Sequence, residues 1–341
     1  MSRLILSALL AGALLVPTYA LAEEVVVYSA RNEHLIKPLF DRYTAETGVP
    51  VKYITDKAGP LLQRLRAEGK RTPADLLITV DAGNLWHAAE SGVLAEIDSA
   101  VLTANVPVNL RDPGGRWFGL SERARTIVYS TERVQPTDLG SYEDLAEPKW
   151  KGRLCLRTSK KVYNQSLVAT LIARHGETEA ERIVRGWVDN LAAAPFSNDT
   201  KAMQAVAAGQ CDVTIVNTYY FGRLQKEQPD IELALFWANQ DSSGTHINVS
   251  GAGVTRHAKH PEAARKLLEW LSSEAAQGEF AARNMEFPVN PKGAADATVT
   301  AWGDFKADEL NVNVAGRLQS AAIRLMDRAG YRRARRPDAR V

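Results

Sequence analysis

The sequence predicts an α/β protein built from two domains. Short apolar runs rich in β-branched residues alternate with segments whose apolar residues recur at helical spacing, which is typical of a parallel, doubly wound sheet. The chain has 341 residues, more than one typical domain. Its hydrophobic fraction of 45% and charged fraction of 24% are ordinary for a globular protein. A net charge of +2 gives no reason to expect nucleic acid or a membrane as a partner.

The alternation of strands and helices runs through most of the chain. We expect strands at residues 25–28, 49–54, 74–80, 124–130, 153–156, 213–216 and 250–254. Helices are expected at residues 35–47, 61–69, 85–89, 163–173, 177–191, 199–209 and 260–271. The strand over 124–130 follows turn-forming residues at 112–115 and is long enough to pass from one lobe to another. The arginine-rich tail after Tyr331 is expected to be a solvated end.

The N-terminus has the pattern of a secretory signal peptide. Arg3 precedes an apolar stretch over residues 4–16, and Ala20-Leu21-Ala22 matches the small-x-small cleavage pattern. The apolar stretch is too short for a transmembrane helix, so an uncleaved anchor is the less favoured alternative. We therefore expect residues 1–22 to be removed and the mature chain to be exported.

The chain contains two cysteines, Cys155 and Cys211. In an oxidising compartment such a pair is expected to form one disulfide. Both cysteines lie beside predicted strands, so neighbouring strands can bring them together. The alternative, a two-cysteine metal site, lacks the CxxC spacing that such sites use.

Two adjacent tyrosines, Tyr219 and Tyr220, follow the apolar strand at residues 213–216 and precede a helix-like pattern. Ligands of open α/β sheets bind at such strand-to-helix junctions. Deprotonated phenols are hard anionic oxygen donors, which suit a hard, highly charged cation. We therefore expect this junction to bind ferric iron.

With these residues in view, the chain resembles the periplasmic ferric-iron-binding proteins of bacterial ABC importers, which are class II solute-binding proteins related in architecture to transferrin lobes. The resemblance covers nearly the whole mature chain. It is carried by the segments at residues 27–31, 73–76, 121–125 and 198–220. Its most specific part is Asn217-Thr218-Tyr219-Tyr220, which matches the paired-tyrosine ligand motif of the family.

The resemblance implies an α/β fold of two lobes, each a mixed sheet flanked by helices, with the ligand in the cleft between them. The first lobe would comprise residues 23–122 and 247–292, and the second would comprise residues 123–246 and 293–341. Each lobe would thus be assembled from discontinuous segments and joined to the other by two hinge strands.

The resemblance also implies a set of iron ligands. Tyr219 and Tyr220 would bind iron from the second lobe, together with Tyr163, which matches an additional tyrosine of one branch of the family. That branch takes a His-Tyr or related pair from the first lobe, but this chain has Asn32-Glu33 there, followed by His34. The first-lobe donor would be the Glu33 carboxylate, the His34 imidazole, or neither, with carbonate or water completing the coordination.

Anion binding is expected to accompany the iron. Three phenolates balance the charge of a trivalent ion, and a guanidinium pairs bidentately with a carbonate-like oxyanion. Arg31 and Arg123 are our candidates for this role. Asn198 and Asn217 match family positions that contact a synergistic anion, which would be carbonate or another small anion.

The function expected from the sequence is therefore a monomeric, non-enzymatic periplasmic carrier that delivers ferric iron to an ABC permease in the inner membrane. An alternative is a binding protein for a small organic ligand, such as a polyamine or a phosphate-bearing compound. An enzyme is disfavoured because the sequence has no Gly-x-Ser-x-Gly, His-Glu-x-x-His or glycine-rich phosphate-loop motif.

Overall fold

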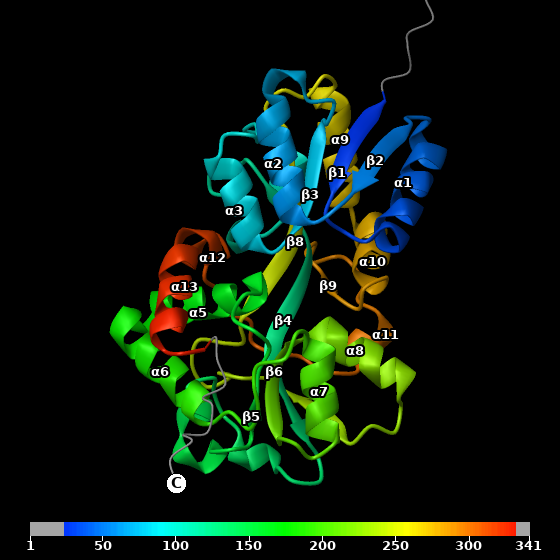
Figure 1. The fold of residues 1–341 in the computed structure, drawn as a ribbon. Helices are drawn as coiled ribbons and strands as arrows, with labels where there is room; N and C mark the ends of the chain where they lie inside the picture. Colours follow the sequence, from blue (N-terminus) through cyan, green and yellow to red (C-terminus); the bar gives the residue numbers. More distant parts are fainter. Residues whose placement is uncertain (1–23, 332–341) are drawn as a thin grey trace, which may run out of the picture.

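The computed structural model describes residues 24–331 of the chain (Figure 1). The predicted signal peptide and the tail from Arg332 onward lie outside the described residues.

The elements follow one another in an irregular alternation of strands and helices. The strands are β1 (Val25–Ser29), β2 (Val51–Thr55), β3 (Leu76–Val80), β4 (Phe118–Ser130), β5 (Leu154–Cys155), β6 (Val213–Asn217), β7 (Leu233–Phe236), β8 (Ile247–Val254) and β9 (Phe287–Pro288). The helices are α1 (Glu33–Thr47), α2 (Ala58–Glu68), α3 (Ala82–Glu90), α4 (Ala100–Asn105), α5 (Val162–His175), α6 (Glu177–Asp189), α7 (Asp199–Ala207), α8 (Thr218–Glu227), α9 (Pro261–Leu271), α10 (Glu274–Ala282), α11 (Ala297–Thr300), α12 (Val314–Arg317) and α13 (Gln319–Arg328).

Local sequence signals explain several element ends. Gly48 has a left-handed backbone with φ of 73° at the end of α1, and its N–H donates to the carbonyl of Thr44. Asn198 precedes α7, and its side chain accepts a hydrogen bond of 2.8 Å from the backbone N–H of Lys201. These contacts agree with the predicted helices over residues 35–47 and 199–209, of which the first ends before Gly48 and the second begins after Asn198.

The sheet is mixed, as the family resemblance implies, whereas the alternation of strands and helices alone favoured a parallel sheet. The strand order is β2-β1-β3-β8-β4-β6-β5, with β7 and β9 also paired to β4. The pairs β1–β2, β1–β3 and β5–β6 are parallel, but β8 and β4 pair antiparallel with their neighbours. The local pattern that predicts a strand does not encode its direction. The strands β4 and β8 are not part of βαβ units, and β4 pairs with strands of both lobes.

These two strands connect two separate hydrophobic cores. Figure 1 shows β4 and β8 running between the region of β1–β3 and the region of β5 and β6. Residues 118–124 of β4 pair with β8, whereas residues 125–129 pair with β6. One long strand thus crosses from one lobe to the other.

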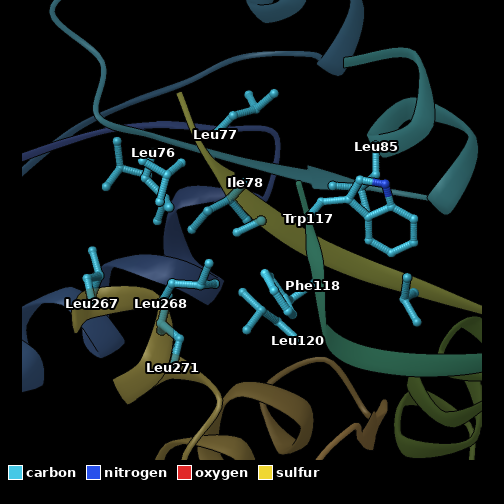
Figure 2. Packing of buried hydrophobic residues seen from close by; sticks show 14 of the residues in the cluster. Leu76, Leu77, Ile78, Leu85, Trp117, Phe118, Leu120, Leu267, Leu268 and Leu271 are labelled. Atoms are coloured by element: carbon cyan, nitrogen blue, oxygen red, sulfur yellow. The ribbon is translucent and has the colours of Figure 1, made fainter. Parts of the chain in front are cut away.

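We call the first lobe the part whose buried side chains fall mainly within residues 25–124 and 247–289, and Figure 2 shows the packing of this core. The second lobe has buried side chains within residues 127–238 in two adjoining clusters. The last described segment contacts both cores, through Val312 and Ala315 in the first and Leu325 in the second. The boundaries expected from the sequence stay a prediction.

A disulfide joins Cys155 to Cys211, as the sequence predicts, and spans 56 residues of the chain. Cys155 ends β5, and Cys211 lies two residues before β6. The bond therefore fixes the start of the strand that leads to the paired tyrosines.

The structure has no helix within residues 24–331 that is long and apolar enough to cross a membrane.

Candidate metal centre

The paired tyrosines lie where β6 ends and α8 begins. Tyr219 is 5% exposed and Tyr220 is half-buried, and their ring centroids are 4.4 Å apart. The first turn of a helix directly after a buried strand fixes the backbone of both residues. Both rings therefore line the same cavity at the carboxyl end of β6.

Tyr163 reaches the same cavity from the first turn of α5. Its side chain is 8% exposed, and its phenol is close enough to that of Tyr219 for each to shift the pKa of the other. The cavity has a volume of about 280 Å³ and is lined from both lobes. The structure thus brings together the three tyrosines that the sequence singles out.

Burial sets the protonation of these phenols. Desolvation and the neighbouring phenol Tyr220 raise the pKa of Tyr163 to about 12, although Arg123 acts in the opposite direction. Desolvation and the phenols of Tyr163 and Tyr220 also raise the pKa of Tyr219 well above its ordinary value. Both hydroxyls are therefore protonated at neutral pH, and a cation that binds them must displace their protons.

A buried arginine on β4, Arg125, hydrogen-bonds residues that neighbour Tyr163 and Tyr219 in the chain. All five N–H donors of Arg125 are engaged, with contacts of 2.9 Å to Asp199, 3.0 Å to Asn217 and 2.6 Å to Asn164 among them. Asn164 follows Tyr163 in the chain, and Asn217 lies two residues before Tyr219. The Nδ2 of Asn217 also donates to the Tyr219 hydroxyl at 3.1 Å. One guanidinium therefore fixes the neighbours of both buried tyrosines.

Arg123 is the best placed anion-binding candidate. Its guanidinium lies 5.7 Å from the ring centroid of Tyr163 and lines the cavity. It is buried, and its Nη1 donates to Ser250 at 3.2 Å, while Nε and Nη2 have no hydrogen-bond partner. Its Nη2 lies 4.0 Å from the Asp81 carboxylate. Unpartnered buried donors are costly, so this guanidinium is suited to receive an anion.

Arg31 also lines the cavity but already holds a carboxylate. Its Nη1 and Nη2 donate to one carboxylate oxygen of Glu286 at 3.0 and 2.9 Å, and both side chains are buried. Burial alone would raise the pKa of Glu286, but the charges of Arg31 and Arg123 and a hydrogen bond from Ser121 lower it. Glu286 therefore stays ionised and occupies the guanidinium face that we expected an external anion to use.

The remaining sequence candidates do not line this cavity. Glu33 and His34 are exposed in the first turn of α1, where Glu33 accepts a hydrogen bond of 2.9 Å from Tyr53. Asn198 caps α7, and Asn217 supports Tyr219 rather than facing the cavity. The roles expected for these four residues as iron or anion contacts stay predictions.

Several residues of the site were missed by the sequence analysis. They are basic or acidic side chains that line the cavity or support it: Lys57, Arg125, Arg157, Lys161, Asp199, Arg223 and Glu286. A signal existed for Arg125, because a charged residue within an apolar strand predicts a buried partner. None existed for Glu286, whose partner Arg31 is 255 residues away.

The donor set is oxygen from phenols rather than the more usual metal ligands. Within the described chain, no group of three or more histidine, cysteine, aspartate or glutamate side chains is placed to hold a metal ion. A metal at this site therefore depends on Tyr163, Tyr219 and Tyr220, whose hard oxygens favour a hard cation.

Comparison with known proteins places the chain in a family. The family model described as bacterial extracellular solute-binding protein matches residues 71–306, more than half of the chain. The chain belongs to this family.

Among relatives in this solute-binding family, iron uptake protein A1 of Synechocystis is 42% identical over 91% of this chain and 88% of its own length. A solved Trichodesmium protein in complex with iron and citrate ligands superposes with a TM-score of 0.88 at 43% identity, covering 90% of this chain and 99% of that one. The open conformation of ferric iron-binding protein A of Mannheimia haemolytica gives a TM-score of 0.87 at 35% identity, covering 92% of this chain and 100% of that one. These similarities confirm the expected fold of two lobes around a cleft.

Proposed function

We propose that this protein is a periplasmic carrier that captures ferric iron through the phenolates of Tyr163, Tyr219 and Tyr220. The convergence of three phenols on one cavity lined from both lobes carries this proposal. Its similarity to iron uptake and ferric iron-binding proteins supports the same cargo.

The chemistry of the site suits a trivalent cation held with an anion. Three phenolates neutralise the ion, and binding releases their protons. The unpartnered nitrogens of Arg123 then anchor a synergistic anion such as carbonate or a chelator carboxylate. A first-lobe donor from Glu33 or His34 would require α1 to approach the phenols, and neither residue is needed to balance the charge.

We propose that the protein delivers its cargo to an ABC permease of the inner membrane, which its membership of a bacterial extracellular solute-binding family supports. We propose that the protein acts as a monomer and carries out no reaction, because ligand capture needs only the cavity and its closure. The signal peptide expected at residues 1–22 supports a periplasmic location.

Titration of the iron-free mature protein with ferric citrate tests the proposal through visible absorption. Phenolate bound to ferric iron absorbs visible light, so a band is expected that grows to one equivalent of iron. It should weaken in Tyr163→Phe and vanish in Tyr219→Phe/Tyr220→Phe. Tyr43→Phe is the matched control, because Tyr43 is buried against Trp270 in the first lobe, away from the cavity. A wild-type protein that stays colourless would overturn the proposal and favour a small organic ligand.

A further inference from the structure

A three-residue segment of the first lobe, Asn284–Glu286, contacts the helix that carries the paired tyrosines. The segment connects α10 to β9, and its residues are 7%, 7% and 2% exposed. Its backbone is tied to the first lobe, because the N–H groups of Asn284 and Glu286 donate to the carbonyl of Ala281 at 3.1 and 3.0 Å. It is therefore a fixed part of the cavity wall.

Asn284 holds an arginine of the second lobe. Its Oδ1 accepts a hydrogen bond from Nη2 of Arg223, which lies on α8. The guanidinium of Arg223 lies 5.3 Å from the ring centroid of Tyr219 and 5.7 Å from that of Tyr220. The hydrogen bond thus links the first lobe to a cation that covers both phenol rings.

Met285 makes the second contact of the segment with α8. It packs with Tyr219 and Val299, and a Cβ atom added to Gly222 would lie 2.7 Å from its sulfur. The glycine therefore permits the close approach. Met285 has a φ of 54°, a left-handed backbone that residues other than glycine rarely adopt. Asn284 and Met285 on either side of this bend both contact residues of α8.

Glu286 anchors the segment to the strand that joins the lobes. Besides its pair with Arg31, it accepts a hydrogen bond of 2.7 Å from the Ser121 hydroxyl on β4. Arg31, Ser121 and Glu286 are all buried, so this anchor is rigid. Asn284 and Met285 are consequently held at one position relative to β4.

We propose that Asn284 is a positioning residue that, through Arg223, latches α8 and its tyrosines to the first lobe and slows the release of bound iron. The inference rests on the proposed function, since it concerns the same phenols. Asn284 itself contacts no phenol and supplies no iron ligand: its amide oxygen is engaged by Arg223.

The test is the rate at which iron-loaded protein loses its visible band to an excess of competing chelator. Asn284→Ala should release iron about tenfold faster, because one partly buried hydrogen bond between the lobes is lost. The position of the band should stay as in the wild type, because Asn284 supplies no iron ligand. Asn284→Asp keeps an acceptor for Arg223 and should restore slow release. Asn105→Ala is the matched control, since that half-buried amide bonds to Ser272 within the first lobe.

Arg223→Gln makes the same test from the second lobe. It should also accelerate release, and the double variant Asn284→Ala/Arg223→Gln should be no faster than the faster single variant. Release from Asn284→Ala within twofold of the wild type, or additive effects in the double variant, would overturn the latch. A wild-type protein without a visible band would instead overturn the proposed function, and the latch with it.

Discussion

The side-chain amide of Asn217 donates a hydrogen bond of 3.1 Å to the hydroxyl of Tyr219. The same amide accepts from the buried Arg125 at 3.0 Å, so the phenol is aimed by a residue two positions before it and by a cation on another strand. A phenol held in this way loses little conformational freedom when it binds a metal. The hydrogen bonds of Asn217 and Arg125 therefore hold the Tyr219 phenol in place before any metal binds.

Arg125→Met is expected to destabilise the protein and to loosen the site. The change removes the guanidinium that hydrogen-bonds the buried Asp199 and leaves only Arg157, 3.5 Å away, and breaking a buried pair in this way typically costs about 3–5 kcal/mol of unfolding free energy. Urea denaturation measures this, and Arg185→Ala is the control, because its exposed pair with Glu181 is worth below about 1 kcal/mol. Equal unfolding free energies for the two variants would contradict the assigned role of Arg125.

Iron affinity is expected to rise with pH. The pKa of Tyr163 is raised to about 12 and that of Tyr219 is raised too, so both are protonated when free and deprotonated when bound. Each proton released changes the apparent affinity about tenfold per pH unit, so the release of three phenol protons gives about a thousandfold per unit. Competition against a chelator of known pH dependence, between about pH 6 and 8, measures this slope.

The pH prediction has an internal control. Tyr163→Phe removes one of the protons, so its slope should be smaller than that of the wild type by about one tenfold step per pH unit. A pH-independent affinity in the wild type would show that the phenols are not the ligands.

Cargo is expected to enter as an anionic ferric complex. The cavity is lined by five cationic side chains, namely Arg31, Lys57, Arg123, Lys161 and Arg223, and by one acidic side chain, Glu286. This field attracts anions and repels a bare cation. Lys57→Glu should slow loading from ferric citrate at low ionic strength by about three- to tenfold, and the difference should shrink as salt is added.

Stopped-flow absorption measures the loading rate. Lys70→Glu makes the same charge change at an exposed position outside the cavity and should have little effect. If the two variants load at the same rate, the cavity charge does not select the cargo.

Loss of the disulfide is expected to lower stability without abolishing iron binding. The bond between Cys155 and Cys211 closes a loop of 56 residues, for which chain entropy predicts about 4 kcal/mol. Thermal unfolding of Cys155→Ala/Cys211→Ala should show a lower melting temperature and, in the folded protein, the same visible band. A lost band at a temperature where the variant is folded would mean that the disulfide positions the phenols directly.

Much of the fold could be predicted from local patterns. The β-branched run at β1, the helical spacing in α1 and the start of the helix at residue 199 are predicted from neighbouring residues, and the structure confirms them. Strand direction is not local, which is why the mixed sheet was expected only from the family resemblance and not from the strand–helix alternation. The strands β7 and β9 are four and two residues long and carry too little pattern to be detected.

The residues of the site likewise fall into those predictable from local sequence and those that come from distant segments. The strand-to-helix junction at Tyr219 is a local feature, whereas Tyr163 was found only through the family resemblance. The partners that tune the site come from distant segments, such as Glu286 against Arg31 and Asn284 against Arg223. These residues become neighbours only when the lobes fold, so no spacing in the sequence predicts their contact.

Anomalous X-ray diffraction at the iron absorption edge, from crystals of the mature protein loaded with ferric citrate, tests the central claim most directly. The account predicts one iron peak in the cavity, bonded to the hydroxyl oxygens of Tyr163, Tyr219 and Tyr220, with an anion against Arg123. An iron peak outside this cavity, or one bonded to fewer than two of these phenols, would contradict it.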